Sequence, residues 1–391
     1  MPREQGHAVV FVLALLACLV AAALLVHDSG RLAAQKRRLI DAADAAAMSG
    51  AVFQARVLNF EGYMNRAIVA NQAALAQSVS LRSWLEHMTR TVDRVDRVTR
   101  FVPWLAQATR ALRSLMSGAN RAAQPLLLSG EGALAMFTAE FALAAESLHL
   151  AAAPVALALV RSTAADNFPG AAPSTRGEAL LAAHAARWGA LTRSYSGSSR
   201  GRQKDITVRS LDRFTVDRGA TLASLVIVRL EKRGGTDLLG FDTWRALDSF
   251  ALHRRDLFGW DESFSIGWGA AEQGARSSAR GIHGNSYRVN GRTSRTAARS
   301  MRSSRLSRGL PAMRDVARPG SADTIDLRLD LELTAPVPMA GANPQAMNAL
   351  ASARVFHARP VARLDRRREL ASLYSPYWHA RLAPAPWLPL P

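Results

Sequence analysis

The longest apolar segment of the chain lies close to its N-terminus. Ala8 to Val26 reads AVVFVLALLACLVAAALLV, nineteen residues without a charge. As a helix this run spans about 28 Å, close to the hydrocarbon thickness of about 30 Å. The apolar core of a cleaved signal peptide is shorter, about 7 to 15 residues. The sequence therefore predicts an uncleaved N-terminal transmembrane anchor over residues 1–27.

Residues 28–165 have a helical pattern. Apolar residues recur at steps of three and four from Phe53 to Ile68. A second series, from Leu81 to Leu105, has a mean step near 3.5, which is the coiled-coil value. Two arrangements fit this region. Its helices could pack within one bundle, or they could form an oligomeric stalk.

Helix-breaking residues divide that region further. Pro103 is expected to kink the helix in which it lies, and Pro125 with the preceding 118–120 segment predicts an interruption. A third helix is predicted over residues 130–160, and its apolar run 151–160 is too short for a second span and is expected to be buried.

A linker with one short helix is predicted over residues 166–204. Proline and glycine residues favour a linker over 166–173. A helix is predicted from Glu178 to Leu191. The sequence YSGSSRG, 195–201, favours a flexible connection after it.

Residues 205–391 are predicted to form a β-rich domain. Ile325 to Leu333 alternates with a strict period of two, which predicts a strand with one buried face. Lys232 to Thr236 is expected to be a turn. The other predicted strands are Ile206–Leu211, Leu222–Leu230, Ser263–Trp268, Tyr287–Val289 and Ala353–His357. The expected fold class is α+β, with a transmembrane helix leading into long helices and then strands.

The formal net charge of +19 raises the question of nucleic-acid binding. Lysine occurs three times among 50 basic residues, so the charge is mostly arginine and is interpreted as a solvated basic surface rather than a nucleic-acid site. Ten arginines and no acidic residue occur between Glu272 and Asp315, from Arg276 to Arg314. The Arg/Ser-rich segment 273–314 is predicted to be either a mobile solvated loop or a patch that binds an anionic polymer.

The sequence motifs that could indicate catalysis or metal binding are weak matches. GSSRG, 197–201, matches GxSxG formally, but it lies in the predicted linker. Asp261, Ser263 and Ser265 match DxSxS, the metal-binding start of a von Willebrand A domain, without the apolar strand that should precede it. His253 and Asp256 can be read as an acid–base pair, but their setting favours a strand or turn.

The spacing of the other candidate residues does not favour chemistry either. Five histidines, His149, His184, His283, His357 and His379, lack metal-ligand spacing. The single cysteine, Cys18, lies within the apolar run and allows no intramolecular disulfide. No catalytic, cofactor-binding or metal-binding residue is predicted, and a non-enzymatic protein is expected.

The N-terminal segment also carries a family resemblance. Gln5-Gly6, the apolar helix, Asp28-x-Gly30-Arg31 and then LIDAADAAAMSGA, 39–51, resemble the N-terminal module of Tad (tight adherence, Flp pilus) assembly proteins of the TadE/TadG type. The late string ELASLYSPYWHARL, 369–382, is similar to C-terminal text in large Tad-associated proteins. The resemblance implies a single-pass bacterial inner-membrane protein whose bulk is periplasmic and whose partners are other Tad pilus or secretion proteins.

Two features qualify that expectation. Arg31 and the basic residues 36–38 outnumber Arg3, so the positive-inside rule alone favours a cytoplasmic C-terminus. Pseudopilin-type members carry a Glu five residues after the processed Gly, but counting from Gly6 this position is Phe11. We therefore expect a resident assembly factor and not a processed pilin. The alternatives are an envelope protein binding an anionic polymer through the Arg-rich segment and a metal-dependent adhesion protein.

Overall fold

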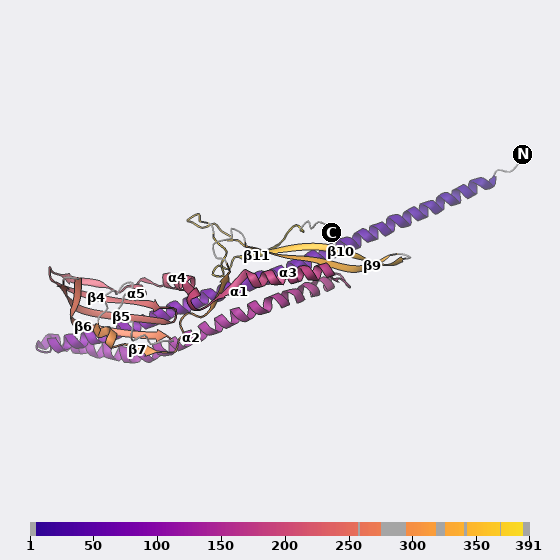
Figure 1. Ribbon diagram of the computed structural model, residues 1–391. Helices are drawn as coiled ribbons and strands as arrows, with labels where there is room; N and C mark the ends of the chain where they lie inside the picture. The colour runs from indigo at the N-terminus through magenta and orange to yellow at the C-terminus, as the bar shows by residue number, and fades with distance from the viewer. Residues whose placement is uncertain are drawn as a thin grey trace. The chain divides into compact units, whose positions relative to one another are not determined.

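The computed structural model describes residues 5–256, 259–274, 295–317, 325–339, 342–367 and 369–385. It confirms the α+β class, with long helices followed by a strand-rich region (Figure 1). The helices are α1 (Gln5–Thr99), α2 (Pro103–Asn167), α3 (Thr175–Leu191), η1 (Gly197–Arg200), α4 (Gly201–Arg209), α5 (Arg213–Val216) and α6 (Arg295–Arg299). The strands are β1 (Ala172–Pro173), β2 (Thr192–Tyr195), β3 (Ala220–Ser224), β4 (Val228–Leu239), β5 (Thr243–Asp256), β6 (Gly259–Gly274), β7 (Arg302–Ser304), β8 (Met313–Val316), β9 (Asp326–Met339), β10 (Ala342–His357) and β11 (Trp378–Leu382).

The chain folds into two compact units, and each is built from separate segments. Unit 1 consists of Met1–Gly62, Ser147–Arg193 and Asp315–Pro391, and unit 2 consists of Tyr63–Glu146 and Ser194–Arg314. These units differ from the expected division at residues 27, 165 and 204. Composition changes along the chain mark where helices give way to strands, whereas the units group parts of the same two helices with different sheets.

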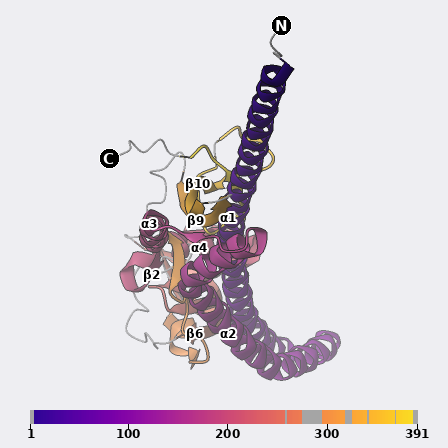
Figure 2. The ribbon, with the colours of Figure 1, turned by 90° about the vertical axis from the view of Figure 1, so that its right-hand side faces the viewer.

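Unit 1 packs helices against a four-stranded antiparallel sheet of order β1-β9-β10-β11. The alternating segment forms β9, as predicted, and its leucines (Leu327, Leu329, Leu331 and Leu333) are all buried. They pack with residues of α1, α2 and α3 in one hydrophobic core. Figure 2 shows β9 and β10 beside α1. The strict period of two therefore marks the buried face of this sheet.

Unit 2 packs an antiparallel pair of helical segments on a five-stranded sheet of order β3-β4-β5-β6-β7. The strands are antiparallel except for the β6–β7 pair. Two glycines of β6 allow α1 to approach, because a Cβ at Gly267 would overlap Thr91 and one at Gly269 would overlap the Ser83 carbonyl. The apolar core includes Trp244, which donates a hydrogen bond to Gln72 over 2.8 Å.

Two predictions about helix breaks differ from the structure. Pro103 begins α2 after a short turn, a position that suits proline because the first helical N–H needs no partner. Pro125 and the 118–120 segment lie inside α2, which continues without interruption. The neighbouring Gln124 is held by Arg82 of α1, its side chain exchanging hydrogen bonds with that residue, so tertiary contacts outweigh the local breaking signal.

The apolar run 151–160 is only partly buried. Ala152, Ala156 and Val160 are buried in unit 1, whereas Pro154 and Val155 are exposed. The segment is thus an amphipathic part of α2, not a wholly buried core helix.

Some predicted strands and turns are also corrected. The 206–211 segment belongs mostly to helix α4, and the 195–201 join contains η1, which is closed by a capping box at Ser196. The expected turn at 232–236 is the interior of β4, where Gly234 leaves room for the Asp248 carboxylate. Residues 222–230 form two strands joined by an apolar turn.

The strands predicted at 263–268 and 353–357 lie within β6 and β10. The strand predicted at 287–289 lies outside the described residues. Much of the Arg/Ser-rich segment is also outside them, but its described part contains α6, β7 and β8 and is not one loop.

Candidate functional site

The predicted anchor is the exposed first part of α1. Its large side chains between Val9 and Val26 are 53–75% exposed, so no other part of the described chain covers them. Burying a side chain such as Leu or Val contributes about 1.5–3 kcal/mol, so this segment is stable in an apolar medium and not in water.

Two helices are long and apolar enough to cross a membrane by length and composition. In α1 none of the most apolar window is buried, whereas 28% of the corresponding window in α2 is buried. The N-terminal helix is therefore the stronger candidate for a membrane anchor.

The alanine-rich face that follows the anchor is packed inside unit 1. Its buried residues include Leu39, Ala43, Ala47 and Ala51. A Cβ on Gly50 would lie 2.7 Å from Val160 Cγ2 of α2 and 2.9 Å from a Leu329 methyl of β9. The small residues do admit another helix closely, as expected, but that helix is α2 of the same chain.

The helix that continues from the N-terminal module meets the C-terminal string in unit 1. Asn59 of α1 donates from Nδ2 to the carbonyl of Trp378 and accepts from its backbone N–H, both over 2.9 Å. The buried indole of Trp378 donates to the carbonyl of Ser372. The C-terminal string therefore closes the fold around the helix that continues from the anchor.

A buried polar network lies next to this core. His149 Nδ1 is 2.9 Å from Glu61 Oε1, and His149 Nε2 is 3.1 Å from Thr192 Oγ1. The imidazole stacks on Trp188 with a centroid separation of 5.0 Å. Hydroxyl, imidazole and carboxylate are thus connected in the order of a nucleophile–base–acid triad. The three residues are 0–3% exposed, so a substrate cannot reach the hydroxyl and the network is a structural one.

A second buried histidine links the matched helix to the sheet. His184 of α3 is 2.9 Å from Gln54 Oε1 of α1 and 2.7 Å from the Arg328 carbonyl of β9. Burial lowers the pKa of His184 and so favours the neutral imidazole. A neutral imidazole carries a single N–H, so it donates to only one of these two oxygens. Sequence spacing missed the contacts of these histidines with α1, because Glu61 and Gln54 are 88 and 130 residues away from them.

The motifs tested for chemistry do not form sites. Ser199 donates to the carbonyl of Ser196 in η1, where it completes a helix cap. Asp261, Ser263 and Ser265 lie along β6, whose rise of about 3.3 Å per residue separates the first from the last by roughly 13 Å. Oxygen ligands of Mg²⁺ lie about 2 Å from the ion, so this arrangement excludes the adhesion-type metal site.

The remaining acid–base candidate is also separated. His253 is buried and its Nδ1 lies 3.2 Å from the Ala251 carbonyl, while Asp256 is exposed at the end of β5. Burial, followed by the charge of Arg233, lowers the pKa of His253. Among the described residues, no group of three or more His, Cys, Asp or Glu could hold a metal ion.

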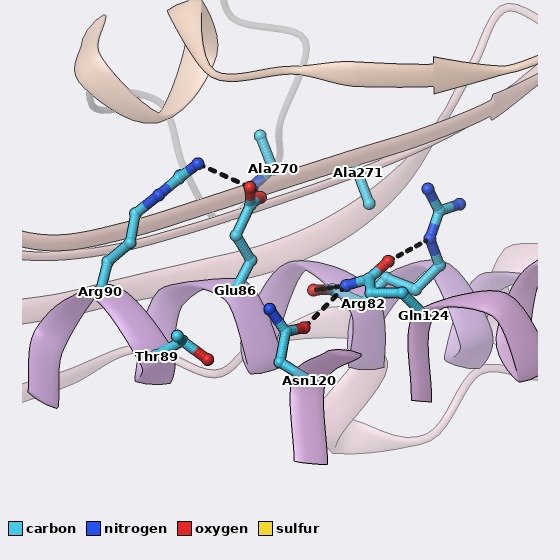
Figure 3. Close-up of a pocket in the computed structure, with 8 residues that line it drawn as sticks. All are labelled: Arg82, Glu86, Thr89, Arg90, Asn120, Gln124, Ala270 and Ala271. Atoms are coloured by element: carbon cyan, nitrogen blue, oxygen red, sulfur yellow. Dashed lines mark hydrogen bonds and ion pairs between the residues drawn. The ribbon is translucent and has the colours of Figure 1, made fainter. Parts of the chain in front are cut away.

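One cavity of unit 2 is lined by α1, α2 and β6 (Figure 3). Its volume is about 210 Å³. Figure 3 shows that its polar side chains bind one another: Glu86 pairs with Arg90 at 2.6 Å, and Gln124 bridges Arg82 and Asn120. Glu86 also accepts from the Ala270 N–H. These groups position the helices on the sheet, and few of their polar atoms are left to bind a ligand.

A larger cavity, about 470 Å³, lies in unit 1 beyond the end of β10. Among its lining residues, Arg359 and Arg363 both pair with Glu369. Burial opposes ionisation of this carboxyl, but hydrogen bonds from Ser375 and Arg359 lower its pKa overall. The arginines are thus largely engaged in holding the chain that leads to β11.

The described structure therefore combines an exposed apolar N-terminal helix with an α+β body. Residues 6–54 match the family model described as Flp pilus-assembly TadE/G-like. This confirms the resemblance of the N-terminal module and supports a Tad/Flp pilus-related role. Comparison with curated proteins and with solved structures found no match.

Proposed function

We propose that this protein is a membrane-anchored, non-enzymatic component of a Tad/Flp-type pilus assembly or secretion apparatus. The exposed apolar run 8–26 crosses the inner membrane once, and the rest of the chain lies in the periplasm with other Tad proteins as partners. The observation that carries the proposal is the match over residues 6–54, which includes the apolar helix and the alanine-rich face.

The structure supports a resident factor over a subunit that must leave the membrane. In unit 1 the matched helix is held by its own chain, through the Gly50 contacts and the two hydrogen bonds of Asn59. The helical face after the anchor is therefore already used for intramolecular packing. Phe11, which stands at the position where pseudopilin-type members carry a Glu, is consistent with this role.

The anchor is tested by placing charges at its centre. L15R/L16R is expected to release the protein from membranes, because each arginine at a helix centre costs about 2.5–3.5 kcal/mol on insertion scales. L15A/L16A keeps the segment apolar and is the matched control. Membrane fractionation with alkaline extraction distinguishes the two, and recovery of the wild-type chain as a soluble cytoplasmic protein would refute the proposal.

The side of the membrane is tested with a single cysteine. Cys18 is the one cysteine of the sequence, so C18S/S198C carries a single thiol in the exposed η1 segment. A maleimide that cannot cross the inner membrane is expected to label this variant in cells with a permeable outer membrane. Labelling only after the inner membrane is disrupted would place the bulk of the chain in the cytoplasm, as the flanking charges alone predict.

The role itself is tested by deletion and complementation. A strain lacking the gene is expected to lose surface Flp-type pili or Tad-dependent secretion, and the wild-type chain restores them. L15R/L16R should not restore them, whereas L15A/L16A should. Normal pilus assembly and secretion in the deletion strain would contradict the function while leaving the membrane anchor intact.

A further inference from the structure

The turn between α1 and α2, in unit 2, exposes large apolar side chains. Val98, Phe101 and Trp104 are 73–75% exposed. Aromatic side chains of this size are normally buried, and a cluster of them in water marks a binding surface. The turn therefore needs an occupant that accepts apolar side chains.

The local backbone holds these side chains outward. The N–H of Val102 donates to the Thr99 carbonyl over 2.9 Å, and the N–H of Ala106 donates to the Val102 carbonyl over 2.8 Å. The hydroxyls of Thr99 and Thr109 meet at 2.9 Å across the two helices. The turn is thus a closed, hydrogen-bonded structure that cannot fold its aromatic residues back into the core without breaking these bonds.

Basic residues surround the apolar turn. The segment 93–113 contains five arginines and two aspartates, a net charge of +3. The aspartates are engaged by Arg97 and Arg113 at 2.8–3.3 Å. Arg100 lies 4.8 Å from the Phe101 ring, and Arg110 donates to the Ala106 carbonyl. Arg100 and Arg110 have no carboxylate partner among the described residues, so their charge is available to an anionic surface.

The same end of unit 2 carries a second apolar turn. Leu225, Val226 and Ile227, between β3 and β4, are 62–81% exposed. The register places this turn beside the β5–β6 end of the sheet, because Val228 pairs with Arg254 and Arg254 pairs with Asp261. The helices reach this end as well, since Arg94 donates to the Ser265 carbonyl. Figure 1 shows the helical turn and the strand ends at the same end of this unit.

We propose that this end of unit 2 docks on an anionic lipid bilayer, with Phe101 and Trp104 inserted and the arginines at the headgroups. Apolar helix surfaces insert about 5–10 Å into the boundary between headgroups and acyl chains. At 1.5 Å per residue, Arg97 and Arg110 lie within about 10 Å of the turn along their helices, which suits the headgroup layer. Arginine side chains near an anionic membrane are attracted to its negative surface potential. The charge favours such a surface over an uncharged apolar protein partner.

The proposal is tested with the full chain held by its anchor in nanodiscs of zwitterionic lipid. Sucrose-loaded vesicles of phosphatidylcholine, with or without phosphatidylglycerol, are added and sedimented. The wild type is expected to sediment with the anionic vesicles, and F101S/W104S is expected to bind at least tenfold more weakly. M136S/L143S, which changes two exposed apolar residues elsewhere on α2, is the matched control and should bind as the wild type does.

Two further measurements separate insertion from simple charge attraction. R100Q/R110Q is expected to lower binding about tenfold or more and to reduce its dependence on salt. Brominated lipids are expected to quench the wild type more than W104F, because the indole of Trp104 reaches the acyl chains.

Several results would overturn the proposal. They are absence of wild-type binding, equal binding by F101S/W104S, and equal loss in M136S/L143S. Self-association of the wild type that disappears in F101S/W104S, without vesicle binding, would instead show that the turn contacts a second copy. None of these results depends on the role in pilus assembly, which the deletion experiment tests separately.

Discussion

Replacing Asn59 by alanine is expected to loosen the last strand of unit 1. The Asn59 amide pairs with both backbone groups of Trp378, in the edge strand β11 of the four-stranded sheet. Its loss leaves two polar groups of a residue that is 2% exposed without these partners. At about 1.5 kcal/mol for each group, less about 0.6 kcal/mol gained from the better helix propensity of alanine, the net loss is about 2–3 kcal/mol.

Hydrogen exchange followed by mass spectrometry measures this loss locally. If β11 opens by itself, its amides in N59A should exchange roughly 30- to 150-fold faster, while peptides of β4 and β5 in unit 2 should be unchanged. N167A is the matched control, because the exposed Asn167 donates only to the Thr163 carbonyl of its own helix. Unchanged exchange of β11 in N59A, or the same acceleration in N167A, would refute the reasoning.

Three further predictions concern buried positions. Burial lowers the pKa of His87 to about 4, although the charge of Asp248 opposes this shift. Protons therefore bind the unfolded chain more tightly, and unit 2 should lose about 3 kcal/mol of stability as pH falls from about 6.5 to 4, with H87L showing a flatter profile in urea titrations. G50L should destabilise unit 1 by about 1–3 kcal/mol or more, because Val160 occupies the space of a side chain. Thermal unfolding tests this, and an unchanged midpoint would contradict it. D248N should lower the unfolding free energy of unit 2 by about 3–5 kcal/mol, because it disrupts the buried ion pair with Arg218 at 2.9 Å. Urea unfolding measures this loss, and a value below about 1 kcal/mol would contradict the prediction.

The sequence predicts those features that have a local hydrophobic pattern. The nineteen-residue apolar run, the alternation of β9 and the helix ending at Leu191 all agree with the structure. Each signal is local, because one face or one whole segment must be apolar for the element to be stable.

Features that depend on tertiary partners were not predictable in this way. The strand through Gly234 is read as a turn because the buried Asp248 carboxylate, which explains the glycine, lies in the next strand. Helix α2 continues through Pro125 because Arg82 of another helix holds the neighbouring glutamine. The contact between Glu61 and His149 joins residues 88 positions apart, so no spacing rule reveals it.

The candidate site likewise has a part that the sequence reveals and a part that depends on tertiary partners. Its anchor and its family module are visible in the first 54 residues. The use of the alanine-rich face inside unit 1 is not visible there, because small residues favour close packing equally well within a chain and between chains.

The pairing of Asn59 with Trp378 also sets the order in which the protein matures. The two residues are 319 positions apart, and synthesis at about 5–20 residues per second places roughly 16–60 s between their emergence. During that interval the anchor is already made, while the alanine-rich face lacks the sheet that covers it. Unit 2 is encoded between these segments and is synthesised before unit 1 can close. Unit 1 therefore closes only after its last strand has been made, and the alanine-rich face stays uncovered, and open to aggregation, until that strand arrives.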